Sequence, residues 1–492
     1  MKDILKTSRS LLENKSLFKV AYIITTFFFS VHFVQYLSYI AIVLLILWGI
    51  WLLIKDIAAK NIKKVYFWQY FTAFLAIGVL SHIINLIIGD GTLFGTAIGF
   101  VLLIITAQFM FLFFPKKDES LKNVRLEIYY IGKAIFLCTT ICNIIGIIVL
   151  FIFKNSLGDR IIIYDNRFTG AYINPNMGAF DCFLCITLGL IIINRSFCSK
   201  IDKKPLNLWL YIFGAVLAFF VLIITDSKGS LLALAVFLGI MTWIVLYKAI
   251  SCNDFKNNVV KLVLVVALLC SLPFMNTVCS PVMSYAVSHS NVEVKLPKND
   301  NKTTEANKNQ PDKKDDKITF EHQSGKKDGS GRVGLYKKSF EFFTEKPVLG
   351  WGCGNMLLKG NETKNNTIDN VKINFGTKLF EAHNGYLTLL STSGVVGFLV
   401  FATIGFLILF ALLKNTVFVV KKKGIGETAF IFAIVVAFCA YAFVEPSLVY
   451  YPALVVAVLW LAIGYGFKLF SENKELNEKM PKFFKKMIGF NY

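Results

Sequence analysis

One histidine, His383, lies at the border between a long polar segment and an apolar run. His383 is followed by Asn384, and after nine further residues come Gly394, two residues and Gly397. A neutral imidazole titrates near physiological pH, so it can remove a proton from an attacking hydroxyl group. We predict that His383 is a catalytic base, that Asn384 orients the ring or the substrate, and that both glycines allow close helix packing. The alternative is an interfacial histidine without a role.

Three cations are candidates for binding an anionic group. Arg332 is the only arginine among the 17 cations of segment 280–382. Its planar guanidinium can bind phosphate oxygens through two parallel hydrogen bonds, which suits a pyrophosphate leaving group. Arg167 and Lys228 lie in short segments between apolar runs. For these two, the alternative is a structural role at the membrane surface.

Two polar features lie within the run 168–194. Asn174, Pro175 and Asn176 form a turn that opens this helix, and we expect Asn176 to be its N-cap. Asp181 is the only acidic residue within the run. An ionisable group inside a membrane span is either functional or paired with a cation near the surface, and the sequence leaves both readings open for Asp181.

Long apolar runs determine the elements that must position these residues. The chain has 492 residues, of which 55% are hydrophobic and 17% charged. A helix of about 20 apolar residues spans a bilayer, and run 20–54 is long enough for two such helices, joined near His32–Ser38. The other runs are 65–89, 91–115, 134–153, 168–194, 205–225, 229–247, 262–292, 384–413, 428–443 and 446–467. We predict an all-α integral membrane protein with about 12 transmembrane helices.

The net charge of +21 follows the expected topology. If the N-terminus is cytoplasmic, 31 Lys and Arg residues fall in cytoplasmic segments and only 4 in the short outer segments. Short cytoplasmic loops of membrane proteins carry an excess of Lys and Arg, and long translocated loops are largely exempt from this rule. We therefore predict that both termini are cytoplasmic and that 280–382 is extracytoplasmic. The charge indicates contacts with anionic membrane lipids, and we expect no nucleic acid partner.

The chain divides at one large extracytoplasmic loop between helices 9 and 10. We expect nine transmembrane helices in 1–279, the loop in 280–382, three helices in 383–470 and a basic cytoplasmic tail in 471–492. Within the loop, 293–330 is predicted to be a disordered insert, because it has too few apolar residues to pack. Residues 331–382 are predicted to be its ordered, catalytic part. This part begins with an amphipathic helix carrying Val333, Tyr336, Phe340 and Phe343 on one face and ending before Pro347.

The order of these motifs resembles the O-antigen ligase family, which includes O-antigen ligases, O-antigen and capsule repeat-unit polymerases, and protein O-oligosaccharyltransferases. The family's hallmark is His, then Asn, Ser or Gln, nine residues and G-x-x-G. His383, Asn384, Gly394 and Gly397 match this hallmark. The family's loop pattern, which begins with Arg and ends in a glycine-rich turn, is matched by Arg332, Tyr336, Pro347, Leu349, Gly350, Gly352, Gly354 and Asn355. Its Arg-x-x-Gly…Asn-Pro-Asn pattern is matched by Arg167, Gly170, Asn174, Pro175 and Asn176. Where the family often has Ser-Arg-Gly, this chain has Ser227, Lys228 and Gly229. Lysine keeps the positive charge of the arginine, but it cannot form the two parallel hydrogen bonds of a guanidinium group.

The resemblance implies a metal-independent, inverting glycosyltransferase that needs no cofactor. Its donor would be a glycan on undecaprenyl pyrophosphate, and an acceptor hydroxyl would attack the anomeric carbon at the outer face of the cytoplasmic membrane. His383 would deprotonate or orient the acceptor, while Arg332, Arg167 and Lys228 would stabilise the departing pyrophosphate. Asn174, Asn176, Asn384 and Tyr336 are implied to bind substrate.

Several functions remain open within and beyond this family. A polymerase would join repeat units for a capsule or another surface polysaccharide, together with a flippase and a chain-length regulator. A ligase would transfer the glycan to lipid A core, a protein or a wall acceptor. The high content of Ile, Lys, Asn and Phe fits an AT-rich, Gram-positive genome, and this favours a capsule or exopolysaccharide polymerase. A flippase would need ionisable groups near the bilayer midplane and paired repeats, and Asp181 alone fits that description.

Overall fold

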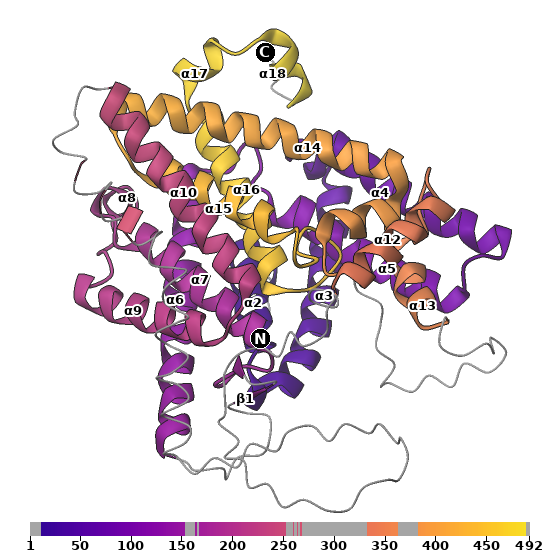
Figure 1. Ribbon diagram of the computed structural model, residues 1–492. Helices are drawn as coiled ribbons and strands as arrows, with labels where there is room; N and C mark the ends of the chain where they lie inside the picture. Colours follow the sequence, from indigo (N-terminus) through magenta and orange to yellow (C-terminus); the bar gives the residue numbers. More distant parts are fainter. Residues whose placement is uncertain are drawn as a thin grey trace, which may run out of the picture.

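The described part of the chain is an almost wholly helical bundle. A computed structural model describes residues 11–152, 163–164, 167–251, 332–362 and 382–488, with isolated positions at 259, 263, 266 and 267. Within these residues, one short antiparallel sheet pairs β1 (Ile163–Tyr164) with β2 (Arg167–Phe168). Figure 1 shows the helices packed side by side. Apart from three of those isolated positions, the expected crossing 262–292 lies outside the described residues, as do the insert 293–330 and the loop residues 363–381.

The apolar runs of the first half form helices as predicted. Run 20–54 divides into α2 (Lys15–Phe28) and α3 (Gln35–Ala58), joined through the 3-10 turn η1 (His32–Val34). The helices that follow are η2 (Asn61–Lys64), α4 (Trp68–Ile88), α5 (Leu93–Gln108), the π-helix η3 (Phe109–Phe113), α6 (Leu121–Ile152), α7 (Pro175–Ile192), α8 (Arg195–Ser199), α9 (Leu208–Ile224) and α10 (Lys228–Ser251).

The second half adds the ordered part of the large loop and the C-terminal helices. These are α12 (Arg332–Glu345), α13 (Cys353–Glu362), α14 (Gly385–Lys423), α15 (Glu427–Tyr441), α16 (Leu454–Ser471), α17 (Lys474–Glu478) and α18 (Lys482–Met487). Among the described residues, eight helical segments are long and apolar enough to span a membrane, and α9 and α15 are shorter apolar helices. The prediction of an all-α membrane protein is confirmed, while the number of twelve crossings stays a prediction.

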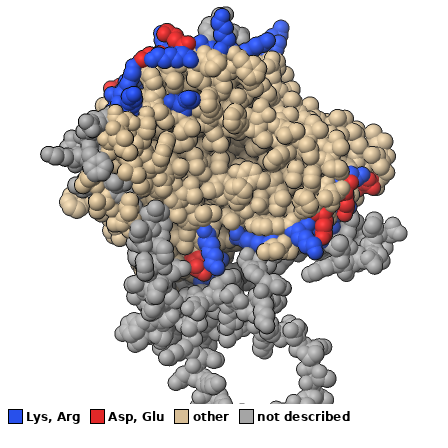
Figure 2. Space-filling view, turned by 45° about the horizontal axis from the view of Figure 1, so that its top comes forward, with Lys and Arg blue, Asp and Glu red and all other residues tan. Residues whose placement is uncertain are grey.

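Charged residues separate into two ends of the bundle. Figure 2 shows Lys, Arg, Asp and Glu side chains at two opposite edges of one face, with a wide band of other residues between them. At one end, Glu427 accepts hydrogen bonds from Arg125 at 3.0 and 2.8 Å and from Lys200 at 2.7 Å. These residues come from segments predicted to face the cytoplasm. The contacts bring those segments together, and the side of the membrane on which they lie stays a prediction.

The ordered part of the large loop packs on the other end of the bundle. The predicted amphipathic helix is confirmed as α12, which packs against α14, while α13 packs against α5. The buried residues of α12 are Ser339 and Phe342, whereas Val333 and Phe340 are exposed. The helix therefore packs on the bundle with its Ser339 and Phe342 side, and Val333 and Phe340 of the predicted apolar face point away from it.

The glycine-rich turn after α12 is joined to a break in α14. Gly394 has φ 61° and ψ −171°, which interrupts the helix. The break frees backbone groups that pair with the turn. Trp351 N–H donates to Ser391 O at 2.9 Å and Gly352 N–H to Thr392 O at 2.9 Å, while Val395 N–H donates to Pro347 O at 2.8 Å. Gly394 thus serves this backbone junction and not the helix packing that we expected for it.

We expect Gly394→Ala to undock the loop from the bundle. A Cβ atom at Gly394 would lie 2.2 Å from Val348 O, and its φ of 61° with ψ of −171° lies in a region that essentially only glycine adopts, at a cost of about 1–3 kcal/mol for other residues. Limited proteolysis of membranes should therefore cleave the variant faster at the lysines of α12. The matched control is Gly405→Ala in the same helix, where a Cβ atom would meet nothing within 4 Å. Equal cleavage of both variants would contradict the role of this junction.

Candidate functional site

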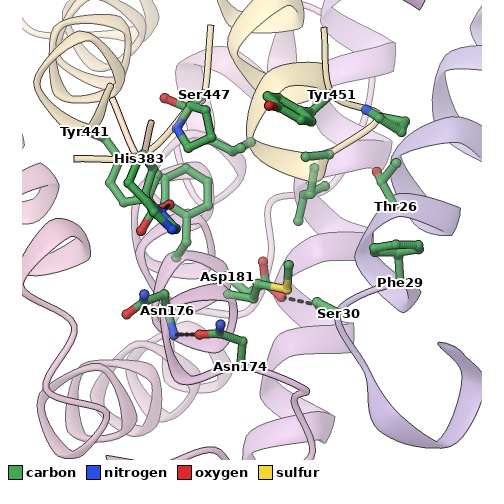
Figure 3. A pocket seen from close by; sticks show the side chains of 18 residues that line it. Thr26, Phe29, Ser30, Asn174, Asn176, Asp181, His383, Tyr441, Ser447 and Tyr451 are labelled. Carbon is green, nitrogen blue, oxygen red and sulfur yellow. Dashed lines mark hydrogen bonds and ion pairs between the residues drawn. The ribbon is translucent and has the colours of Figure 1, made fainter. Parts of the chain in front are cut away.

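A cavity of about 390 Å³ lies where four helix ends meet. Its wall is built from the end of α2, the start of α7, the end of α15 and the segment that leads into α16. Figure 3 shows His383 and Tyr441 on one side, Thr26 and Phe29 on the opposite side, and Asp181 between them. All these positions come from segment ends that the predicted topology places outside. The cavity contains His383, the residue from which the sequence analysis began.

A glutamate that the sequence analysis did not assign to the site joins the two predicted catalytic residues. Glu445 Oε2 lies 3.2 Å from His383 Nδ1, and Glu445 Oε1 lies 3.0 Å from Arg332 Nη2. Arg332 Nη1 also donates to Val444 O at 3.0 Å. His383 and Glu445 line the cavity, whereas Arg332 lies behind Glu445 and does not line it. The carboxylate therefore connects the histidine inside the cavity to the arginine outside it.

The backbone around His383 is held by two predicted substrate-binding residues. Asn384 Oδ1 accepts from Tyr386 N–H and Leu387 N–H, each at 3.0 Å, so Asn384 is the N-cap of α14. Its amide group donates to Phe443 O at 3.0 Å. Tyr336 Oη lies 3.1 Å from the same carbonyl and 3.3 Å from His383 O. Asn384 and Tyr336 thus position His383, and neither lines the cavity.

The backbone of His383 itself adopts an unusual conformation. Its φ is +46°, in the left-handed region that few residues other than glycine adopt, although asparagine, aspartate and histidine are found there more often than the rest. The N-cap at Asn384 and the hydrogen bonds to the Phe443 carbonyl hold this turn in place. A conformation of this kind persists only where its surroundings enforce it, and such positions cluster at functional sites.

The opposite wall of the cavity carries the Asn-Pro-Asn turn. Asn174 is the N-cap of α7, since its Oδ1 accepts from Asn176 N–H at 2.8 Å, so the prediction of Asn176 as the cap is wrong. Proline stands directly after this cap, where its missing N–H costs nothing. Asn176 Oδ1 instead accepts from Arg167 Nη2 at 2.7 Å, and Arg167 Nε donates to Thr225 O at 2.7 Å. Both asparagines line the cavity, and Arg167 lies behind Asn176.

Asp181 faces the cavity from the second turn of α7. Its side chain is only 2% exposed, and its Oδ2 accepts from Ser30 Oγ at 3.0 Å. Within the described part of the chain, no Lys or Arg forms an ion pair with it. Of the two readings left open by the sequence, the structure does not bear out pairing with a cation.

Lys228 is the predicted site residue that stands apart from the cavity. It is exposed at the start of α10 and does not line the cavity. The next residue, Gly229, packs closely on Tyr441 and Val444, the residue whose carbonyl binds Arg332. Lys228 therefore lies near the Arg332 side of the site.

Comparison with known protein families finds a match over part of the chain. Residues 213–402 match the family model described as O-antigen ligase. The match covers 190 of the 492 residues and supports assignment to the O-antigen ligase family. The matched stretch includes Lys228, Arg332, Tyr336, His383 and Asn384, whereas Arg167, Asn174 and Asn176 precede it. No curated protein matches the chain.

The match indicates an O-antigen ligase-type function in polysaccharide assembly. Glu445 was missed because it stands alone in sequence, after a short apolar run and before Pro446. The signal available was that it is the only charged residue between Glu427 and Phe467. Ser30 and Thr26 carried no such signal, because they are ordinary small polar residues within the first apolar run.

Proposed function

We propose that this protein transfers a glycan from undecaprenyl pyrophosphate to a hydroxyl group of an acceptor glycan at the outer face of the cytoplasmic membrane. We further propose that it acts as a repeat-unit polymerase in surface polysaccharide synthesis. The observation that carries the proposal is the His383–Glu445–Arg332 arrangement, with His383 inside a cavity and Arg332 outside it. It provides a base for the acceptor next to a cation for the leaving group.

The acceptor side of the reaction is assigned to His383. With Glu445 Oε2 3.2 Å from Nδ1, the carboxylate favours the tautomer that carries its proton on Nδ1. In this tautomer Nε2 carries no proton of its own, so it can accept the proton of the acceptor hydroxyl as that oxygen attacks the anomeric carbon. Glu445 also stabilises the imidazolium formed in this step, since a carboxylate beside an imidazolium favours the charged ring.

The donor side is assigned to the cations. As the new carbon–oxygen bond forms, the bond between the anomeric carbon and the pyrophosphate oxygen breaks, and the electron pair passes to that oxygen. Arg332 uses Nη1 and Nη2 to bind Val444 and Glu445 and keeps its other N–H donors for phosphate. Its side chain is 26% exposed, so an anion can reach it. Lys228, exposed on the same side, adds a second positive charge.

Reconstitution tests both the chemistry and the role. Purified protein in detergent is given lipid-linked repeat units, and the products are separated by size. A ladder of multiples of the repeat unit, formed equally with and without a chelator, is expected. A single addition, formed only when lipid A core or protein is supplied, would make the protein a ligase. Movement of the lipid-linked glycan across proteoliposomes without any transfer would make it a flippase, and loss of activity with chelator would contradict the metal-independent mechanism.

A further inference from the structure

The charges around the cavity divide the site into two regions. The cavity wall contains the acidic side chains of Asp181 and Glu445, and none of the described residues that line it is Lys or Arg. The nearest cations lie behind this wall, with Arg332 bound to Glu445 and Arg167 bound to Asn176. Like charges repel most strongly where water is excluded. The cavity is therefore unfavourable for a pyrophosphate and favourable for a neutral group.

Two buried polar groups in the wall can form further hydrogen bonds. Ser447 is fully buried, and its Oγ has no hydrogen-bond partner. Asp181 accepts one hydrogen bond, from Ser30, although a carboxyl group with two oxygens can accept several. A buried polar group without a hydrogen-bond partner is destabilising. Both groups line the cavity (Figure 3), so a ligand with hydroxyl groups can satisfy them.

The remaining wall complements such a ligand. The side-chain oxygens of Asn174 and Asn176 are occupied by Asn176 N–H and Arg167, which leaves the amide N–H groups as donors. Aromatic rings complete the wall, and those of Phe180 and Tyr441 lie 4.5 Å apart. Acceptors, donors and apolar rings together suit a sugar ring, which has both hydroxyl groups and C–H faces.

We propose that this cavity is the subsite for the acceptor sugar, in which Asp181 and Ser447 bind sugar hydroxyl groups and His383 meets the hydroxyl that reacts. This inference rests on the proposed function, because it takes His383 as the base for the acceptor. The donor pyrophosphate then stays on the Arg332 side of Glu445. Asp181 thereby gains a role as a determinant of which acceptor sugar is used.

Acceptor binding can be measured apart from transfer. The probe is one repeat unit of the producing strain's polysaccharide on a simple alkyl chain, which can accept a glycan but cannot donate one. Its affinity for the full-length protein is measured by calorimetry without donor. Asp181→Asn keeps the shape of the side chain, and it is expected to weaken binding about tenfold, the loss typical of leaving a buried hydrogen-bonding group without its partner. Asp202→Asn, the same change at a surface position, is expected to leave the affinity unaltered.

Transfer assays then separate acceptor from donor. For Asp181→Asn, the KM for the alkyl-linked acceptor should rise about tenfold, while the KM for the lipid-linked donor stays within about twofold. Ser447→Ala should give a smaller rise in the same acceptor KM. If the Asp181→Asn protein is lost from the membrane, the Ser447→Ala variant alone tests the acceptor subsite. Unchanged acceptor affinity in both variants, or an equal rise in both KM values, would overturn the subsite. If the wild type binds the probe but transfers nothing, the proposed function fails and the saccharide subsite stands.

Discussion

Replacing His383 with asparagine is expected to slow glycan transfer by about two to four orders of magnitude, the range typical for loss of a general base. Asparagine tolerates the left-handed conformation that His383 adopts, with φ at +46°. Its amide can also still bind Glu445, but it cannot take a proton. The variant therefore removes the chemistry and keeps the turn, and its protein level in the membrane should equal that of the wild type by immunoblot.

Alanine and glutamine variants test the same assignment from two sides. His383→Ala should lose at least as much activity, because it adds strain at a positive φ to the loss of the base. Glu445→Gln should lose less, since it keeps the shape of the side chain and removes only the charge that orients and stabilises the ring. Glu472→Gln, at the opposite end of the bundle, is the matched control. Near-normal polysaccharide length from His383→Asn, in cells lacking the wild-type protein, would refute the base assignment.

The helices and the importance of His383 follow from local patterns in the sequence. Charge-free runs of bilayer length form helices because the chain must satisfy its backbone hydrogen bonds internally in lipid. The division between α2 and α3 follows from a run that is too long for one crossing. The amphipathic spacing after Arg332 likewise predicts α12, which ends at Glu345 just before Pro347. These features depend on residues that are close in sequence.

The functions of individual side chains depend on contacts that the sequence does not reveal. Glu445 lies 62 residues after His383, and only the packing of α14 against α15 brings them together. Asn384 was expected to face the substrate, yet its side chain caps α14 because the four N–H groups that begin a helix need partners. The side on which α12 packs was also not predictable, since it depends on the break at Gly394 and the turn that pairs with it.

Replacing Arg332 with alanine is expected to slow transfer by about 100- to 1,000-fold, the loss typical of a group that stabilises developing charge. The KM for the lipid-linked donor should rise, because a contact to the pyrophosphate is lost, while the KM for the alkyl-linked acceptor should change little. Arg332→Lys should recover part of the activity, since it keeps a charge but cannot reproduce the two contacts to Val444 and Glu445. Lys337→Ala, an exposed cation of the same helix, is the control and should lose less than about twofold.

A double variant separates leaving-group stabilisation from simple pairing with Glu445. Arg332→Ala leaves the Glu445 carboxylate, 17% exposed, without its cation, and this alone could disturb His383. If neutralising Glu445 were the whole role of Arg332, removing that charge as well in Arg332→Ala/Glu445→Gln would restore activity to the level of Glu445→Gln alone. We expect no such recovery, because the pyrophosphate still lacks its cation. Recovery to the Glu445→Gln level, together with an unchanged donor KM in Arg332→Ala, would limit Arg332 to holding the loop and the glutamate in place.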